Sequence, residues 1–464
     1  MTVVRRPAYN THSCPQPGTN GFWETAFPSR STQVKSETAR RYLEKHFISL
    51  MKETEDRNER LRQFQKTMEN SNLPASDKEA LYQQFVKEET QLSRISRMKL
   101  KSARYKRIKL IGKGGFGEVW LVQDITTSEL FALKVLRKSD IILKDQLANV
   151  RAERDILSET SNHWVVQLYF SFQDESRLYL VMEYLCGGDL MTALIKRGRF
   201  NEPTARFFAG EITIALNSIH QLHFLHRDLK PDNVLIDKNG HIKLTDFGLS
   251  TSYLKQDNGK QQLLNEIQEL MIEQCQISKE QYAIHHERQK GVGTCGYTAP
   301  EVLRGQETTV LSDYWSLGVI LYEMLFGFPP FPGKSLQETA LRILHWKRAL
   351  RFPSNINVSN EAIDLLKHLL CEPESRYQYE QIVNHSFFKG FNFDDIESNI
   401  PPMIPIIHYP TDTSHFDDIE PEPCDGIDLP CEPDLAKFAF LGYTYKSKPR
   451  SLTMAKFDSQ TLVE

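Results

Sequence analysis

The chain has 464 residues, of which 40% are hydrophobic and 25% charged, with a formal net charge of -3. This length exceeds that of one small domain, and the composition is that of a soluble globular protein. The net charge excludes a uniformly basic nucleic-acid-binding protein, so we expect no nucleic-acid partner. Seven scattered cysteines without a CxxC pair indicate reduced thiols rather than a disulfide framework or a zinc site. No apolar segment matches a signal peptide or a membrane span, so we expect a cytoplasmic protein without a membrane anchor.

The N-terminal part of the chain divides by composition into two segments. Residues 1–33 are rich in Pro, Ser, Thr, Asn and Gly without periodicity, which predicts a disordered N-terminus. Residues 34–104 predict two helices around a turn at Pro74, with an apolar stripe formed by Tyr42, Phe47, Leu50 and Met51. Between Lys35 and Arg107 there are 18 Lys and Arg against 11 Asp and Glu. This surplus is typical of a solvated helical hairpin; the alternative is a docking surface for an acidic partner.

A compact domain is predicted over residues 105–388, and a tail of different composition over residues 389–464. β-like runs dominate the first third of the domain and helical patterns the remainder, which predicts an α+β fold. Between Lys389 and Lys437 the tail contains no Lys or Arg, while Asp, Glu and Pro are frequent. Such a segment cannot build its own core. It is therefore either a free acidic tail or an extension strapped across the domain.

The first chemical motif is rich in glycine and comprises Gly112, Lys113, Gly114, Gly115, Phe116 and Gly117, followed by Val119. A GxGxxG pattern alone is weak evidence, because dinucleotide-binding folds also use it. Here the glycines lie between two strand-like runs, and no helix begins after the third glycine. A glycine-rich hairpin can bring backbone N–H groups close to phosphates, so phosphate binding is favoured over a dinucleotide fold.

A lysine ends the strand-like run that follows the glycine motif. Lys134 could be an ordinary surface charge. Its functional interpretation is a contact to the α- and β-phosphates of a nucleotide, which requires a carboxylate to fix the ammonium group. Glu153, in an amphipathic segment, is the candidate for this carboxylate.

The most specific motif is the string His226–Asn233, followed after a short hydrophobic strand by Asp246–Gly248. Asp228 can accept the proton of a substrate hydroxyl, and Lys230 can steady the γ-phosphate. Asn233 and Asp246 carry oxygen ligands of the kind that Mg²⁺ prefers. Since chance occurrence at this spacing is very improbable, these residues predict phosphoryl transfer from ATP.

Together with Ala299–Glu301 and Asp313–Gly318, these motifs resemble those of the eukaryotic protein kinases. The sequence Lys230–Asn233, which follows the HRD triplet His226–Asp228, resembles that of the serine/threonine kinases. The resemblance implies a small β-rich lobe over a larger helical lobe, with ATP and Mg²⁺ in the cleft. It implies a nucleotide site formed by Ile111 to Gly117, Val119, Ala132, Lys134, Met182, Glu183, Leu185 and Asp189. It also implies an ion pair between Glu301 and Arg376, and a hydrophobic spine of Leu157, Leu168, His226 and Phe247.

Further segments resemble the NDR/LATS subgroup of the AGC kinases: the tail over 400–419, the sequence Phe440–Tyr445, the N-terminal helices, and an insert at about 252–288. The resemblance implies that Phe416 lies near the nucleotide and that Thr444 is phosphorylated by an upstream kinase. It implies a Mob-type co-activator on the N-terminal helices, and signalling in cell polarity, morphogenesis or mitotic exit. A nuclear or spindle-pole pool would be compatible with it. Substrates are expected to carry basic residues N-terminal to the target Ser or Thr, paired by Asp189, Asp232 and Glu323.

The activation segment departs from the AGC pattern. Lys290 stands where a phosphorylated Ser or Thr is usual, and Cys295 and Gly296 replace the usual Pro and acidic residue. A lysine has the wrong charge to replace a phosphate. The segment could be held by other contacts, with Thr444 and a Mob partner as the switch; activity could be low; or the chain could be a Mob-binding pseudokinase scaffold. We favour the first hypothesis, since the catalytic residues are all intact.

The insert itself contains a helical apolar stripe formed by Leu263, Leu264, Ile267, Leu270 and Met271. Such a stripe is typical of a surface helix with one packed face. The alternative is a regulatory element that blocks the helix of Glu153 or the substrate region until it is displaced.

Overall fold

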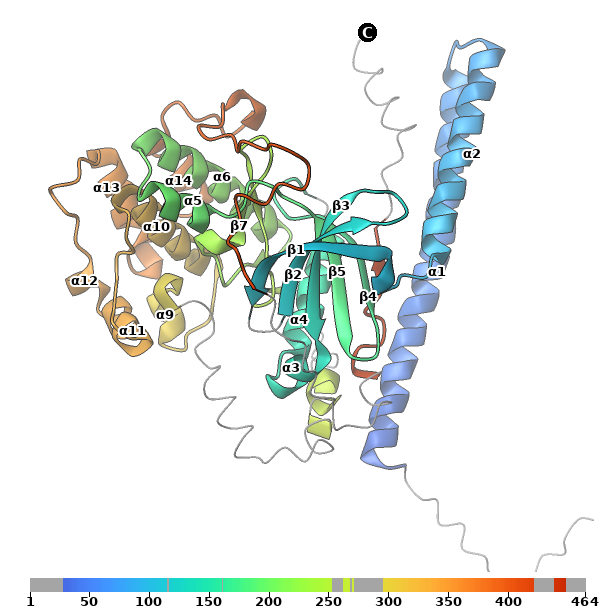
Figure 1. Cartoon of the computed structure of the whole chain (residues 1–464), viewed down its shortest axis with the longest axis horizontal. Helices are drawn as coiled ribbons and strands as arrows, with labels where there is room; N and C mark the ends of the chain where they lie inside the picture. Colours follow the sequence, from blue (N-terminus) through green and yellow to red (C-terminus); the bar gives the residue numbers. More distant parts are fainter. Residues whose placement is uncertain are drawn as a thin grey trace, which may run out of the picture.

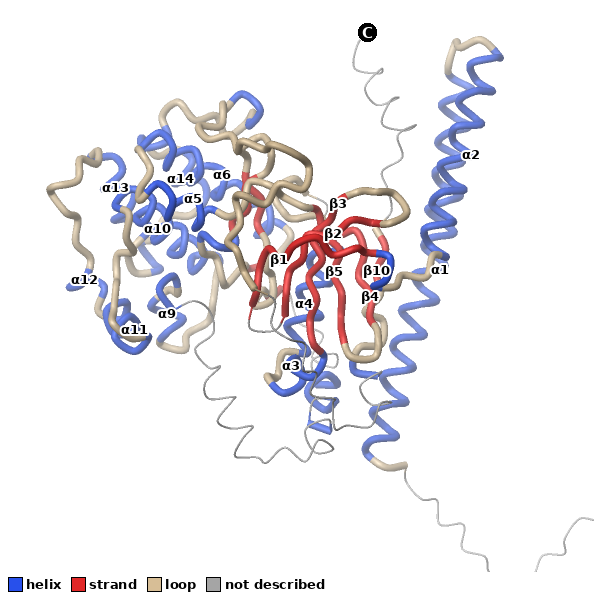
Figure 2. Tube along the Cα trace, viewed as in Figure 1, coloured by secondary structure: helices blue, strands red, loops and turns tan. Residues whose placement is uncertain are grey.

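The computed structural model describes residues 28–114, 117–160, 162–252, 262–267, 269–270, 295–420 and 438–447. These residues form two lobes flanked by a long helical hairpin (Figure 1). The small lobe, formed by the first part of the domain, is built on a β-sheet. The large lobe, formed by the second part, is almost entirely helical, as Figure 2 shows by colour. The predicted α+β bilobal architecture is therefore confirmed.

The small lobe is a six-stranded sheet with one long helix packed beneath it. The strand order is β1-β2-β3-β5-β4-β10, with antiparallel pairing throughout. The strands are β1 (Tyr105–Gly114), β2 (Gly117–Asp124), β3 (Leu130–Arg137), β4 (Leu168–Gln173), β5 (Arg177–Glu183) and β10 (Tyr445–Lys446). Two helices follow β3, namely α3 (Lys138–Leu143) and α4 (Leu147–Glu159). The central strands β3 and β5 are buried on both faces, which their runs of Leu, Val and Ala make favourable.

The large lobe is organised around α10 (Val310–Phe326), whose residues are buried from Ser312 to the end of the helix. Its other helices are α5 (Leu190–Arg197), α6 (Glu202–Gln221), α9 (Pro300–Leu303), α11 (Leu336–Leu344), α12 (Trp346–Ala349), α13 (Asn360–Leu369) and α14 (Tyr379–Val383). Two short ribbons line the cleft side, β6 (Phe224–Leu225) with β9 (Thr251–Ser252) and β7 (Val234–Ile236) with β8 (Ile242–Leu244). In the part of the chain that the structure describes, no helix combines the length and apolarity needed to cross a bilayer.

The N-terminal hairpin consists of α1 (Arg30–Asn70) and α2 (Ala75–Arg97), with the turn at Pro74 as predicted. The helix begins at Arg30, inside the segment 1–33 that was expected to be disordered, because the Ser29 hydroxyl accepts a hydrogen bond from the backbone N–H of Thr32. Phe64 stacks on Phe85 with ring centroids 4.5 Å apart and joins the two helices. Among the described residues the members of the predicted stripe are exposed, namely Tyr42, Phe47, Leu50 and Met51, although the ring of Tyr42 lies beside Gly442 of the tail.

The tail is strapped along both lobes in its described parts. At the hinge, the Tyr184 hydroxyl donates to the carbonyl of Asp412 at 2.7 Å. The backbone of His415 passes so close to Gly188 (φ +73) that a Cβ there would lie 2.4 Å from its carbonyl oxygen. Further on, β10 extends the small-lobe sheet by pairing with the edge strand β4. Of the two alternatives, a free tail and a strapped extension, the described residues show the second.

Candidate active site

The centre of the cleft is a three-charge cluster that joins three elements. Lys134 on β3 places its Nζ 2.6 Å from Glu153 Oε1 on α4 and 3.1 Å from Asp246 Oδ1 after β8. Burial alone would lower the pKa of Lys134, but the carboxylates of Asp246 and Glu153 outweigh burial and raise the pKa above its ordinary value. The charge of Lys134 in turn lowers the pKa of Asp246. The sequence prediction of this pairing therefore agrees with the geometry.

Glu153 reaches the cluster because of where it lies on its helix. Val150 and Leu157 lie three residues before and four residues after it, so all three occupy one face of α4. This face is buried against the sheet, and Glu153 is itself only 2% exposed. A carboxylate so placed is costly without a partner, and burial raises its pKa. The position of α4 therefore decides whether Lys134 is held.

The catalytic loop brings Asp228, Lys230 and Asn233 together at the large-lobe side of the cleft. Lys230 Nζ lies 2.9 Å from Asp228 Oδ2, and Asn233 Nδ2 donates to the backbone carbonyl of Asp228 at 2.8 Å. The turn η2 (Pro231–Asn233) produces this proximity by directing Asn233 back toward Asp228. These contacts hold the Asp228 carboxylate at the mouth of the cleft, where a substrate hydroxyl could deliver its proton.

Asp313, at the start of α10, holds the catalytic loop and had no role in the sequence analysis. Its carboxylate accepts hydrogen bonds from the backbone N–H groups of His226 and Arg227 at 3.0 and 2.9 Å, and lies 2.8 Å from His220 Nε2. Arg227 has φ +66, a conformation that an L-residue adopts at a cost unless its surroundings fix it. The motif that begins with Asp313 was noticed, but sequence could not show that this aspartate bonds a loop 86 residues away.

A cleft of about 910 Å³ lies between the lobes and contains the predicted nucleotide residues that the structure describes. Gly115 and Phe116 lie outside the described residues. The lining includes Ile111, Gly112, Lys113, Gly114, Gly117, Val119, Ala132, Lys134, Met182, Glu183, Leu185 and Asp189. Further lining residues were not predicted: the apolar Leu136 on β3, Val166 before β4 and Leu235 on β7, and the residue before the DFG triplet, Thr245. A strand's alternation could have suggested Leu136, which lies two residues after Lys134.

The glycines of β1 and β2 show which positions leave room for a ligand. At Gly117 a Cβ would lie 1.9 Å from the carbonyl oxygen of Val135, so packing alone requires glycine there. At Gly114 a Cβ would meet nothing within 4 Å among the described residues. Packing within the protein therefore does not require Gly114, whereas close approach of its backbone to a phosphate would. This arrangement fits a nucleotide triphosphate.

Two hydrophobic features complete the cleft. The predicted spine residues Leu157, Leu168, His226 and Phe247 are all at most 1% exposed, and the rings of His226 and Phe247 lie 5.0 Å apart. Phe416 of the tail lines the cleft and stacks on Tyr184, with ring centroids 5.9 Å apart. The tail thus contributes a wall of the cleft where the resemblance placed Phe416.

The acidic residues expected to bind a basic substrate gather on the large-lobe side of the cleft. Asp189 and Asp232 line the cleft, and Glu323 lies near enough to Asp232 for their charges to interact and accepts a hydrogen bond from the Tyr297 hydroxyl at 2.5 Å. Burial and the neighbouring charge of Asp232 raise the pKa of Glu323, although the Tyr297 bond opposes this shift. Asp189 also has a structural role, because its carboxylate caps α5 by accepting from the backbone N–H and hydroxyl of Thr192.

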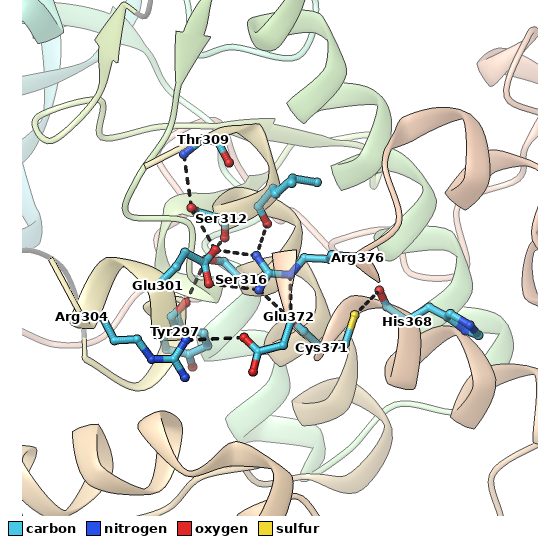
Figure 3. Close-up of polar contacts among 11 residues, drawn as sticks. Tyr297, Glu301, Arg304, Thr309, Ser312, Ser316, His368, Cys371, Glu372 and Arg376 are labelled. Carbon is cyan, nitrogen blue, oxygen red and sulfur yellow. Dashed lines mark hydrogen bonds and ion pairs between the residues drawn. The ribbon is translucent and has the colours of Figure 1, made fainter. Parts of the chain in front are cut away.

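The segment after the activation loop is fixed by a buried ion pair (Figure 3). Arg376 contacts both oxygens of Glu301, at 2.6 and 3.1 Å, and its side chain has no exposed surface. Ser316 on α10 donates to the carbonyl of Tyr297 at 2.8 Å and fixes the start of the same segment. The predicted pairing of Glu301 with Arg376 is therefore present. Lys290 lies outside the described residues.

The C-terminal sequence Phe440–Tyr445 packs on α4. Phe440 and Tyr443 are 0% and 1% exposed, whereas Thr444 between Tyr443 and β10 is exposed. Arg151 of α4 donates to the carbonyl oxygens of Ala439 and Leu441, at distances between 2.6 and 3.0 Å. The hydroxyl that was predicted to be phosphorylated is thus open to solvent, next to the helix that carries Glu153.

A β-rich lobe over a helical lobe, with a Lys–Glu–Asp cluster in the cleft and an aspartate on a loop held by a buried second aspartate, defines a protein kinase. Comparison with known proteins agrees. The family described as "Protein kinase domain" matches residues 105–388.

The similar curated proteins narrow the class. The serine/threonine-protein kinase CBK1 of Pneumocystis carinii is 39% identical over 449 residues, which are 90% of this chain and 88% of CBK1. The probable serine/threonine-protein kinase ndrB of Dictyostelium discoideum is 40% identical over 437 residues, 87% of this chain and 80% of ndrB. The serine/threonine-protein kinase Warts of Drosophila melanogaster is 41% identical over 85% of this chain, which spans 37% of the length of Warts. The chain belongs to the NDR/LATS subgroup of the AGC serine/threonine protein kinases.

Proposed function

We propose that the chain transfers the γ-phosphoryl group of ATP to Ser or Thr hydroxyls of proteins that carry basic residues before the target. The observation that carries this proposal is the convergence of Lys134, Glu153, Asp246 and Asp228 on one cleft, with every charge paired or facing the cleft. A scaffold without turnover would have no chemical need for the buried charge of Lys134, which costs free energy unless both carboxylates remain.

The residues of the cleft divide the work of phosphoryl transfer. Lys134 would hold the α- and β-phosphates and Lys230 the γ-phosphate, while Asn233 and Asp246 would hold Mg²⁺ through their side-chain oxygens. Bound Mg²⁺ would neutralise charge that develops on the phosphate oxygens. Asp228 would orient the substrate hydroxyl and accept its proton. Because Lys230 donates to Asp228 from one side, the carboxylate keeps a fixed direction during this step.

The peptide side of the cleft supports a preference for basic substrates. Burial, with the nearby charge of Asp232 as a further cause, raises the pKa of both Glu323 and Asp189. An arginine guanidinium would relieve the repulsion among these groups by pairing with the carboxylates. Since Asp189 also caps α5, we expect Asp232 and Glu323 to contribute more to arginine recognition than Asp189.

The N-terminal hairpin supports a Mob-type co-activator as partner. Its exposed apolar side chains on α1 include Phe47 and Met51, at 59% and 68%, which an isolated helix face would not retain without a partner. The same hairpin carries the surplus of basic residues, which favours an acidic partner surface. Residence in the cytoplasm, with a nuclear or spindle-pole pool left open, stays a prediction that fluorescence microscopy of the tagged chain would test.

The first experiment is transfer of radiolabelled phosphate from ATP to an arginine-rich Ser/Thr peptide, with and without a Mob protein. Transfer by the wild type that disappears in Asp228→Asn would establish the activity, and stimulation by Mob would support the partner. Absence of transfer from folded wild-type protein under both conditions would refute the proposal in favour of a scaffold.

Thr444 is proposed as the phosphosite of an upstream kinase. We expect Thr444→Ala to cut the Mob-stimulated activity strongly, because its phosphate would add charge beside α4 that alanine cannot carry. Thr444→Ser should keep the response. Unchanged activity in Thr444→Ala, measured with the upstream kinase present, would contradict this role.

A further inference from the structure

A second pocket lies on the large lobe, apart from the catalytic cleft. It has a volume of about 340 Å³ and is formed by Arg304 after α9, by residues at the end of α11 and in α12, and by Glu372 after α13. None of its lining residues also lines the cleft. Figure 1 shows α9, α11 and α12 next to one another, on the side of the large lobe far from the N-terminal hairpin. The pocket therefore has no part in phosphoryl transfer as described above.

The lining of this pocket has a surplus of positive charge. Arg304, Lys347 and Arg348 line it, against Glu372 as its one carboxylate. Lys347 Nζ lies 3.1 Å from Glu372 Oε1, and Arg304 Nη1 lies 3.4 Å from Glu372 Oε2, the pair drawn in Figure 3. The exposed Arg348 makes no ion pair with any residue that the structure describes. One carboxylate thus faces three cations, and the pocket is not neutralised from within.

The carboxylate of Glu372 shows what kind of group the pocket accommodates. Burial alone would raise the pKa of Glu372, but Lys347 and Arg304 outweigh burial and lower the pKa below its ordinary value. The side chains of Lys347 and Arg304 nevertheless keep 66% and 36% of their surface exposed. Both cations can therefore accept a second anionic partner from solvent, together with Arg348.

Trp346 adds an apolar surface and a donor to the pocket. Its ring packs edge-on against the buried Trp315, with centroids 6.2 Å apart, and Lys347 Nζ lies 5.5 Å from its own ring centroid. The indole Nε1–H of Trp346 is buried and has no hydrogen-bond partner among the residues that the structure describes. A buried donor without a partner costs free energy, and an acceptor bound in the pocket would offer one. Cations beside an unused donor favour a ligand rich in acceptor oxygens.

The pocket is connected to the acidic side of the cleft through one short segment. Tyr297 in η3 (Cys295–Tyr297) donates to Glu323, one of the residues proposed to bind basic substrates, and α11 packs against both η3 and α9. Arg304 follows Tyr297 by seven residues. Seven residues span at most roughly 25 Å when fully extended, so the two sites are no farther apart than this along the surface segment. One extended substrate chain is long enough to occupy both.

We propose that this pocket binds an acidic segment of the protein substrates. The substrate would then have two charged regions: basic residues before the target, which pair with the acidic side of the cleft, and a run of Asp or Glu about ten residues away, which pairs with Arg304, Lys347 and Arg348. Opposite charges at the two sites fix the direction in which the substrate lies and disfavour the reverse orientation. This inference rests on the kinase function proposed above and extends it to a second determinant of substrate choice.

The test compares peptides that differ only in charge at a distance from the target. Each carries the arginine-rich Ser sequence, a neutral linker of about ten residues, and a run of either Glu or Gln, placed before the arginines or after the target. We measure KM and kcat with the full-length chain. In parallel, fluorescence anisotropy follows the binding of a labelled Glu run without a target Ser. We expect the Glu run to lower KM roughly ten-fold in one of its two positions, as several exposed charge pairs acting together would do, with kcat unchanged.

Three variants assign this effect to the pocket. Lys347→Glu should remove most of the gain in KM while leaving both constants for the Gln peptide at their wild-type values. Lys367→Glu is the matched control, because Lys367 is also exposed on the large lobe but does not line the pocket. Glu372→Gln keeps the shape of the side chain and frees Lys347 and Arg304 from their internal partner. It should therefore tighten binding of the Glu run, a gain that loss of folding cannot produce.

Other outcomes overturn the proposal. An equal effect of Lys347→Glu and Lys367→Glu would show only general attraction between charges. Unchanged binding in Glu372→Gln would place the Glu run elsewhere on the chain, such as on the basic N-terminal hairpin. Equal KM for the Glu and Gln peptides, with no anisotropy change in the wild type, would show that the pocket binds no acidic segment. If the wild type phosphorylates neither peptide, the proposed function fails, but the anisotropy measurement still tests the pocket because it needs no turnover.

Discussion

The catalytic loop in the large lobe and α4 in the small lobe both carry an essential acidic residue, yet different parts of the chain hold them. The loop of Asp228 is fixed from within its own lobe, through backbone bonds to Asp313. α4 is held by the C-terminal segment that carries Phe440 and Tyr443, where Arg151 donates to the carbonyls of Ala439 and Leu441. The first set of contacts persists as long as the lobe is folded. The second depends on segments that can be phosphorylated, bound or displaced, so control of the enzyme is expected to act on Glu153 rather than on Asp228.

We expect the largest effect from a substitution in the catalytic loop, which is held by contacts within its own lobe. Asp228→Asn keeps the size and the contacts to Lys230 and Asn233 but cannot accept a proton. We expect kcat to fall by about 10²–10⁴, the usual contribution of a positioned general base. Single-turnover phosphorylation of the peptide measures this loss, and retention of ATP binding is the control. A loss below ten-fold would show that Asp228 is not the base.

The next largest effect is expected on the stability of the large lobe, which carries the catalytic loop. Arg376→Ala leaves the carboxylate of Glu301 buried without its partner, which typically costs about 3–5 kcal/mol. Denaturant unfolding followed by circular dichroism would show this as an earlier transition of the large lobe. The matched control is Arg304→Ala, which removes an exposed pair with Glu372 at 3.4 Å and should change stability by about 1 kcal/mol or less. Similar losses in both variants would contradict the assigned difference in burial.

The sequence predicts the catalytic residues more completely than the contacts that hold the catalytic loop and α4 in place. The residues expected to touch phosphate or substrate, such as Lys134 and Asp228, are constrained by chemistry and belong to short local motifs. A single sequence therefore identifies them. Asp313 was found only as part of a motif, because its role arises from a contact with a loop distant in sequence. The packing of Phe440 beside α4 is a tertiary choice among many apolar partners. No local pattern specifies such a choice. The buried Leu264, Ile267 and Leu270 fit both interpretations of the insert.

We expect a moderate effect from weakening the contacts between the C-terminal segment and α4. Phe440→Ala removes a fully buried ring beside Lys138, whose ammonium lies 5.2 Å from the ring centroid and whose pKa burial lowers to about 8. We expect a roughly ten-fold drop in peptide phosphorylation, since the cavity weakens the hold on α4 by more than about 1.4 kcal/mol. Unfolding of the large lobe should not change. Ile406→Ala, at an exposed tail position, is the control and should retain activity. If both variants keep full activity, the C-terminal segment does not support α4.

The smallest effect is a pH dependence of substrate binding on the large-lobe side of the cleft. Burial raises the pKa of Glu323 above its ordinary value of 4.5, so as pH falls this carboxyl binds a proton earlier than a free glutamate would. The protonated form cannot pair with an arginine, and KM for the arginine-rich peptide should therefore rise on the acidic side of the profile while kcat changes little. Linkage gives the stability the opposite trend: in the interval above 4.5 the folded state binds more protons than the unfolded state, so stability falls as pH rises through the folded pKa. In Glu323→Gln the KM should be high at every pH and its acidic rise lost. A profile identical to wild type would assign arginine recognition to Asp232 and Asp189, and would leave Glu323 as the partner of Tyr297.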